Sequence, residues 1–203
     1  METKNSELVI PAGFEYLEGA IAKFRKLYPH FDRNVFIMMP FSSPYTESIY
    51  QAITSEVEAH GLIPLRADMQ TFSPMLWWNV VTYMIGSAYG ITIYQQIGTI
   101  PFNPNVSIEA GFMMALDRPV LLLAESELKG LPVDFSGHIY KSFNSKSLSS
   151  SIGQAVKDWV ERDLSYYNYG NKKVIVFVSI GGTCRCVMAK GILSQRFHDM
   201  KIS

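Results

Sequence analysis

The chain has 203 residues, of which 48% are hydrophobic and 18% are charged, and this balance excludes a wholly disordered polypeptide. Lys and Arg number 18, as do Asp and Glu, so a net charge of zero gives no support to nucleic-acid binding or to an anionic-membrane surface. The length fits one domain with a substantial core, and we expect its partner to be a small molecule.

The N-terminal residues, METKNSELVIPAG, lack the basic region, apolar run and cleavage site of a secretory signal. The longest apolar runs, such as residues 120–124 and 174–178, have the length of strands rather than of membrane spans. Cys184 and Cys186 are too close together for a stapling disulfide and too few for a zinc site, so we expect free thiols and no bound metal. These features predict a soluble, cytoplasmic protein that makes no membrane contact.

The chain begins with an amphipathic helix and continues with alternating strands and helices. Apolar residues from Phe14 to Leu27 recur at spacings of three and four, which predicts a helix in an N-terminal extension, residues 1–33. Short apolar runs then predict strands at residues 35–39, 62–65, 89–94, 120–124 and 138–143. Periodic segments predict helices at residues 45–60, 75–88, 106–116 and 148–164. The alternation predicts an α/β domain over residues 34–164, a doubly wound, flavodoxin-like parallel sheet of about five strands flanked by helices.

Residues 101–116, PFNPNVSIEAGFMMAL, combine turn residues with a carboxylate on an apolar helix. Because Pro104 fixes its own φ and asparagine caps helices, we expect a helix to begin at about Asn105 or Val106. Glu109 lies about one turn into that helix, among apolar side chains. Ligands of doubly wound sheets bind beyond the carboxyl ends of the strands, and this segment follows the third strand. We therefore expect Glu109 to belong to a ligand site.

Five motifs occur in the order found in a known family. They are VFIMMPF at the first strand, RAD after the second, NPNV-x-x-EAGFMMAL at the third helix, PVLLL at the fourth strand and LPVDF before the fifth. Together they resemble nucleoside 2-deoxyribosyltransferases, which are relatives of Toll/interleukin-receptor-like domains. The resemblance covers about residues 34–143. It implies cleavage of an N-glycosidic bond in a nucleoside, nucleotide or NAD, as deoxyribosyltransferase or NAD hydrolase, without a required cofactor.

The resemblance also implies roles for individual residues. Glu109 would act at the anomeric carbon, because an oxocarbenium-like centre needs a fixed anion on one face. Asp68 would be a second catalytic carboxylate, binding ribose hydroxyls or protonating the departing base. The loops after the first three strands would bind the ligand, with backbone N–H groups of the first loop facing a phosphate. The ligand-binding residues expected there are Met39, Pro40, Phe41, Ser42, Ser43, Arg66, Asn103 and Asn105.

Other interpretations remain open at these positions. The stretch from Tyr94 to Thr99 lacks the acid that family members often carry there, so a catalytically inactive nucleotide-sensing module is an alternative, as is an oligomeric scaffold. Glu109 could instead interact with the positive end of its own helix, and Asp68 could pair with Arg66. The two asparagines could be cap and turn residues. Trp77 and Trp78 could stack on a base, although aromatic side chains on a helix are usually core.

Residues 165–203 form a linker and a short tail of different character. The segment KKVIVFVSIGGTCRCVMAKGILSQRF resembles the strand, phosphate loop and helix that open a low-molecular-weight tyrosine phosphatase. Ser179 occupies the position of the nucleophilic cysteine and has no evident base, so we expect no phosphatase chemistry. Ser179, Gly181, Gly182 and Arg185 could still form an anion-binding loop. Because the tail is too small for its own core, we expect it to extend the sheet or to pair with another subunit of a homo-oligomer.

Overall fold

The computed structural model describes residues 8–41, 45–96, 102–128 and 140–164, and its centre is a five-stranded, all-parallel sheet. The strands lie in the order β2-β1-β3-β4-β5, and every neighbouring pair is parallel. They are β1 (Asn34–Met38), β2 (Ile63–Leu65), β3 (Tyr89–Tyr94), β4 (Val120–Glu125) and β5 (Lys141–Phe143). The prediction of a doubly wound α/β fold is confirmed.

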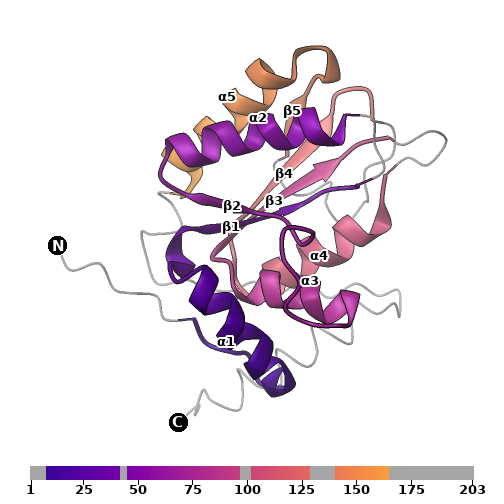
Figure 1. The fold of residues 1–203 in the computed structure, drawn as a ribbon. Helices are drawn as coiled ribbons and strands as arrows, with labels where there is room; N and C mark the ends of the chain where they lie inside the picture. Colours follow the sequence, from indigo (N-terminus) through magenta and orange to yellow (C-terminus); the bar gives the residue numbers. More distant parts are fainter. Residues whose placement is uncertain (1–7, 42–44, 97–101, 129–139, 165–203) are drawn as a thin grey trace, which may run out of the picture.

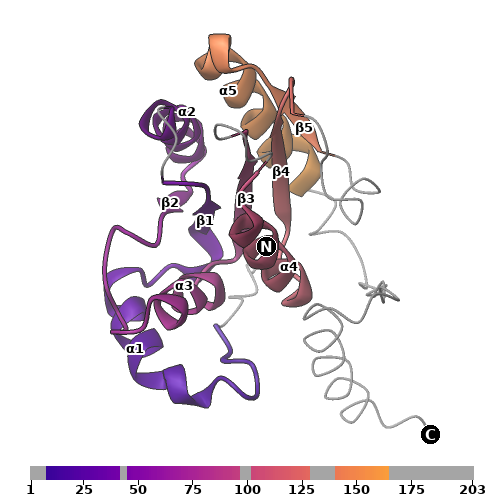
Figure 2. The same ribbon diagram turned by 90° about the vertical axis from the view of Figure 1, so that its right-hand side faces the viewer.

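Helices cover both faces of the sheet (Figures 1 and 2). On one face lie α2 (Thr46–Ala59) and α5 (Leu148–Asp158), which pack against each other. On the other face lie α1 (Glu18–Leu27), α3 (Leu76–Ile85) and α4 (Pro104–Ala115), with α3 in contact with both of the others. The N-terminal helix is therefore part of one layer of the domain, because Leu17, Ile21 and Phe24 are buried in the core of that layer.

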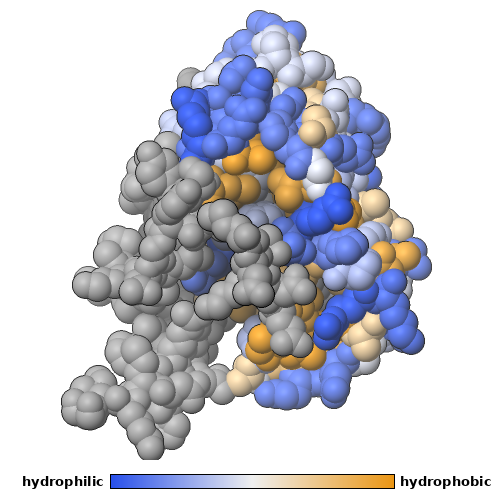
Figure 3. Space-filling view, turned by 90° about the vertical axis from the view of Figure 1, so that its left-hand side faces the viewer, coloured by the Kyte–Doolittle hydropathy of each residue, from blue (hydrophilic) through white to orange (hydrophobic). Residues whose placement is uncertain are grey.

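Each face of the sheet has its own hydrophobic core, and the strands contribute to both. Along β1, Phe36 and Met38 belong to the core under α1, α3 and α4, whereas Val35 and Ile37 belong to the core under α2 and α5. Successive side chains of a strand point to opposite faces, so a strand covered on both sides must be apolar throughout. This explains why β1, β3 and β4 are largely apolar, whereas β5, with its half-buried Lys141 and exposed Ser142, is not. The outer surface of the layer with α2 and α5 is mostly hydrophilic (Figure 3, upper part).

The strand order fixes where the two halves of the sheet diverge. The chain leaves β1 through α2 and returns as β2 on one side of β1. It leaves β3 through α4 and returns as β4 on the opposite side of the sheet. The carboxyl ends of β1 and β3 therefore flank the point where the strand order reverses, which is the usual ligand site of such sheets. The loops and helix starts beyond these two strands are the candidates for a functional site. Among the described residues, no helix has the length and apolar character needed to cross a membrane.

Several boundaries differ from those predicted by periodicity. α4, the helix of the NPNV motif, begins at Pro104, one or two residues earlier than expected. α3 ends at Ile85 rather than at residue 88. β5 begins at Lys141, whereas the predicted strand began at residue 138. Residues 138 and 139 lie outside the described residues. Helix ends are set by capping and local turns, and periodicity does not encode these.

Candidate active site

The start of α4 is fixed by an asparagine cap and a proline. The side-chain oxygen Oδ1 of Asn103 accepts a hydrogen bond of 3.0 Å from the backbone N–H of Asn105. Pro104 occupies the first helical position, where its missing N–H costs nothing. Asn103 is therefore the capping residue, and Asn105 lies within the first turn. The expected helix start at Asn105 or Val106 was wrong because the cap is the first asparagine of the motif.

Glu109 lies beyond the first turn of α4, and the first turn contains no acidic residue. The interpretation of Glu109 as a first-turn acid at the positive end of the helix is thus wrong. Among the described residues, its carboxylate makes no hydrogen bond or ion pair. Burial raises the pKa of Glu109 to about 7, because few water molecules or donors stabilise the ionised form. A partly buried carboxylate without a partner destabilises the fold, which is the pattern of a functional group.

Glu109 is one of the residues that line a cleft between α3 and α4. It has a volume of about 350 Å³. Its described lining residues are Leu76, Trp77 and Val80 from α3, and Asn105, Ile108 and Glu109 from α4. α3 and α4 lie side by side on one face of the sheet (Figure 2). Each helix begins after the loop that follows a strand, β2 for α3 and β3 for α4, so the cleft at their starts lies where a doubly wound fold usually binds its ligand. Such a volume accommodates one small organic molecule.

The walls of the cleft are apolar and partly exposed. Leu76 is 80% exposed, Ile108 44% and Trp77 42%. Large apolar side chains at this exposure are available to contact a ligand. From the sequence, Trp77 was only an alternative ligand contact, and Leu76, Val80 and Ile108 were not predicted to line a site. For Leu76 and Trp77, the signal was the run of four large apolar residues at 75–78, because one buried stripe of a helix needs fewer.

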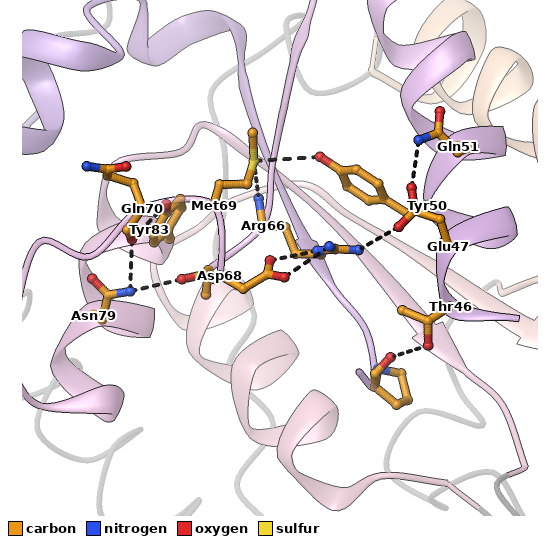
Figure 4. Close-up of polar contacts among 12 residues, drawn as sticks. Thr46, Glu47, Tyr50, Gln51, Arg66, Asp68, Met69, Gln70, Asn79 and Tyr83 are labelled. Carbon is orange, nitrogen blue, oxygen red and sulfur yellow. Dashed lines mark hydrogen bonds and ion pairs between the residues drawn. The ribbon is translucent and has the colours of Figure 1, made fainter. Parts of the chain in front are cut away.

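Asp68 lies at the same edge of the sheet but in a different environment (Figure 4). Its carboxylate accepts two hydrogen bonds from the guanidinium of Arg66, 2.7 Å from Nε and 2.9 Å from Nη2. The Arg66 guanidinium also lies 4.2 Å from the ring centroid of Tyr50 and 3.9 Å from the nearer carboxylate oxygen of Glu47. The predicted pairing of Asp68 with Arg66 is confirmed, and Asp68 is not among the described residues that line the cleft of Glu109.

The loop after β1 adjoins this ion pair. Met39 and Pro40 are buried, and the Pro40 carbonyl accepts a 3.0 Å hydrogen bond from the Thr46 hydroxyl at the start of α2. The Phe41 ring is 58% exposed, and its centroid lies 5.6 Å from the Arg66 guanidinium carbon. The expected contributors Ser42 and Ser43, and the tail residues Ser179, Gly181, Gly182 and Arg185, lie outside the described residues.

The carboxyl end of β3 lies beside Glu109. Tyr94 is buried there, and its pKa is raised to about 12, chiefly by burial and in smaller part by the negative charge of Glu109. Gln95, in the stretch where the resemblance led us to expect an acid, is also buried. At this end of β3, the ionisable side chain beside Glu109 is therefore the phenol of Tyr94.

The chain was compared with protein-family models and with characterised proteins, and nothing matches it. The resemblance to nucleoside 2-deoxyribosyltransferases thus stays a prediction that rests on the ordered motifs.

Proposed function

We propose that this protein cleaves the N-glycosidic bond of a nucleoside, a nucleotide or NAD, with Glu109 acting at the anomeric carbon of the ribose. The observation that carries the proposal is the position of Glu109, a partly buried carboxylate in an apolar cleft at the switch point of the sheet. The ordered motifs shared with N-glycosidic-bond enzymes support the same assignment.

The environment of Glu109 suits a reaction that develops positive charge. Cleavage of an N-glycosidic bond passes through an oxocarbenium-like state at the anomeric carbon. A carboxylate in an apolar wall interacts more strongly with that charge than it would in water, and Glu109 has no described cation to weaken the interaction. The same carboxylate could act as a nucleophile and form a glycosyl ester, or it could stabilise the cation while water attacks.

A binding module without turnover is the second candidate, and the position of Asp68 favours it. The Asp68 carboxylate is engaged by Arg66 and does not line the cleft, so one carboxylate remains where the expected mechanism used two. A module of this kind would bind the same ligands through Trp77 and Asn105 and release no base.

Incubation of the full chain with NAD, nucleosides and nucleotides, followed by chromatographic detection of free base, tests the proposal. We expect base release that Glu109→Gln abolishes, and kcat/KM that rises with pH through about 7, since the ionised carboxylate is the active form. Glu58→Gln, at an exposed position of α2, is the matched control and should keep full activity. Binding without base release would support the second candidate, and equal turnover by Glu109→Gln would refute the catalytic role.

A further inference from the structure

The end of α2 meets the end of α5 through the side chain of His60. α5 continues into a π-helical segment, Trp159–Asp163, which is the last regular element of the described chain. π-Helical segments are rare and are often found at functional positions. Trp159 anchors this segment in the core under α2 and α5, where its side chain is 3% exposed. The contact of the segment with the end of α2 is polar and is made with His60.

The His60 ring lies between hydrogen-bond acceptors. Its Nδ1 is 2.9 Å from the backbone carbonyl oxygen of Glu56 and 3.5 Å from the carboxylate Oε1 of the same residue. Its Nε2 is 3.4 Å from the carboxylate Oε1 of Glu161, in the π-helical segment. Among the described residues these two carboxylates are the ionisable groups that face the ring, one from its own helix and one from the segment packed against it. Both ring nitrogens therefore face oxygen atoms that accept hydrogen bonds.

One protonation state of the ring satisfies this arrangement. A neutral imidazole carries a single N–H, and the shorter contact, with the Glu56 carbonyl, places that hydrogen on Nδ1. The lone pair on Nε2 then faces the carboxylate of Glu161, and the contact is repulsive. When the ring is protonated, both nitrogens donate, and the contact with Glu161 becomes an attraction between opposite charges. Protonation of His60 thus reverses the sign of its interaction with the π-helical segment.

We propose that His60 and Glu161 form a pH-dependent clasp, which holds the end of α5 against α2 when the His60 ring is protonated and releases it when the ring is neutral. The hydrogen bond to the Glu56 carbonyl is the main cause that raises the pKa of His60 above 6.5; the two carboxylates add to it, and burial opposes it. The clasp therefore contributes its full stability below about pH 6.5 and loses it as the pH rises through the raised pKa.

The clasp is separate from the proposed catalytic site. α2 and α5 lie on one face of the sheet, and α4, which carries Glu109, lies on the other (Figure 1). The π-helical segment also has a second fastening, because Nζ of Lys141, in β5, lies 3.0 Å from Oδ2 of Asp163. Since this ion pair contains no imidazole, we expect it to hold the segment at acidic and at alkaline pH. It is therefore the matched control for the clasp.

Two measurements on the full chain test the proposal. Proton NMR follows the titration of the His60 ring between pH 5 and pH 9, with its signal assigned by comparison with His60→Gln. Hydrogen–deuterium exchange with mass spectrometry follows the backbone N–H groups of residues 159–164 at pH 5.5 and pH 8, corrected for the intrinsic exchange rate at each pH. Parent, Glu161→Gln and Asp163→Asn are compared. The series is repeated in a Glu109→Gln background, which removes the titration of Glu109 from the same pH range.

In the parent we expect the segment to exchange about threefold more slowly at pH 5.5 than at pH 8, the size of a partly exposed ion pair. Glu161→Gln should abolish this difference and lower the pKa of the His60 ring, because a glutamine amide can donate to the neutral ring. Asp163→Asn should speed exchange by a similar factor at both pH values and keep the difference between them. The Glu109→Gln background should not alter these results.

A His60 ring that titrates alike in the parent and in Glu161→Gln would overturn the clasp, as would a pH difference in exchange that survives in Glu161→Gln. Because the titration also uses the unaltered protein, a His60 ring that titrates below pH 6.5 in the parent refutes the clasp even where a variant fails to fold. Neither measurement uses a nucleoside or NAD, so the proposed catalytic function stands or fails separately, on the release of base.

Discussion

Replacement of Glu109 by glutamine should stabilise the protein at pH 8 and change little at pH 5. Burial raises the pKa of Glu109 to about 7 in the folded protein, above its ordinary value of 4.5. In the window between these two pH values the folded protein keeps a proton that the unfolded chain releases. The free energy of unfolding therefore falls as pH rises through this window, and the loss is complete above about pH 7. Glutamine resembles the protonated side chain and carries no such penalty.

The size of the effect follows from the shift in pKa. A difference of about 2.5 units corresponds to about 3 kcal/mol, and because the side chain is only partly buried, we expect about 1–3 kcal/mol of added stability for Glu109→Gln at pH 8. Urea unfolding at pH 5 and pH 8, followed by circular dichroism, measures it. Glu58→Gln controls for the loss of a surface carboxylate. If Glu109→Gln and the parent differ by the same free energy of unfolding at both pH values, burial does not disfavour the ionised form of Glu109 and the reasoning is wrong.

Two further predictions concern the helices that form the cleft. Gly86→Ala should destabilise the protein by about 1–3 kcal/mol, because a Cβ at the end of α3 would overlap the buried ring of Phe24. Gly111→Ala on α4 has open space for its methyl group, so it should be neutral or stabilise the protein by up to about 1 kcal/mol. Thermal melts compare the two variants, and equal effects on the melting temperature would contradict the packing argument. Asn103→Ala should cost about 1 kcal/mol through loss of the α4 cap, measured by urea unfolding, and Asn103→Asp should retain most of it.

Hydrophobic pattern was sufficient to predict the elements of the fold but not all of their ends. β1, β3 and β4 are buried on both faces, and their largely apolar sequences are a direct consequence of that burial. The end of α3 is different, since the helix stops at Ile85 although the apolar pattern continues to Ala88, which leaves three residues to turn the chain into β3. Such turns depend on tertiary contacts, here between Gly86 and the ring of Phe24.

Only one wall of the cleft could be predicted from the sequence, because the exposure of a side chain depends on tertiary packing rather than on the hydrophobic pattern. The motif around Glu109 marked α4 as one wall. On α3, the apolar residues at 75–78 could have been core, and nothing in the sequence distinguishes Trp77, which faces the cleft, from Trp78, which packs on Tyr16. That distinction depends on where α1 and its preceding turn lie against α3, a contact between segments about 60 residues apart.

The two candidate carboxylates show most clearly what the structure adds. In the sequence, Asp68 and Glu109 are both acids that follow a strand of a parallel sheet, and both are reasonable catalysts on that ground. In the structure, Asp68 is held by two hydrogen bonds from Arg66. Glu109 lies in an apolar cleft with no described partner and has its pKa raised to about 7 by burial. Because an unpaired, partly buried carboxylate lowers the stability of the fold, Glu109 rather than Asp68 carries the proposed function.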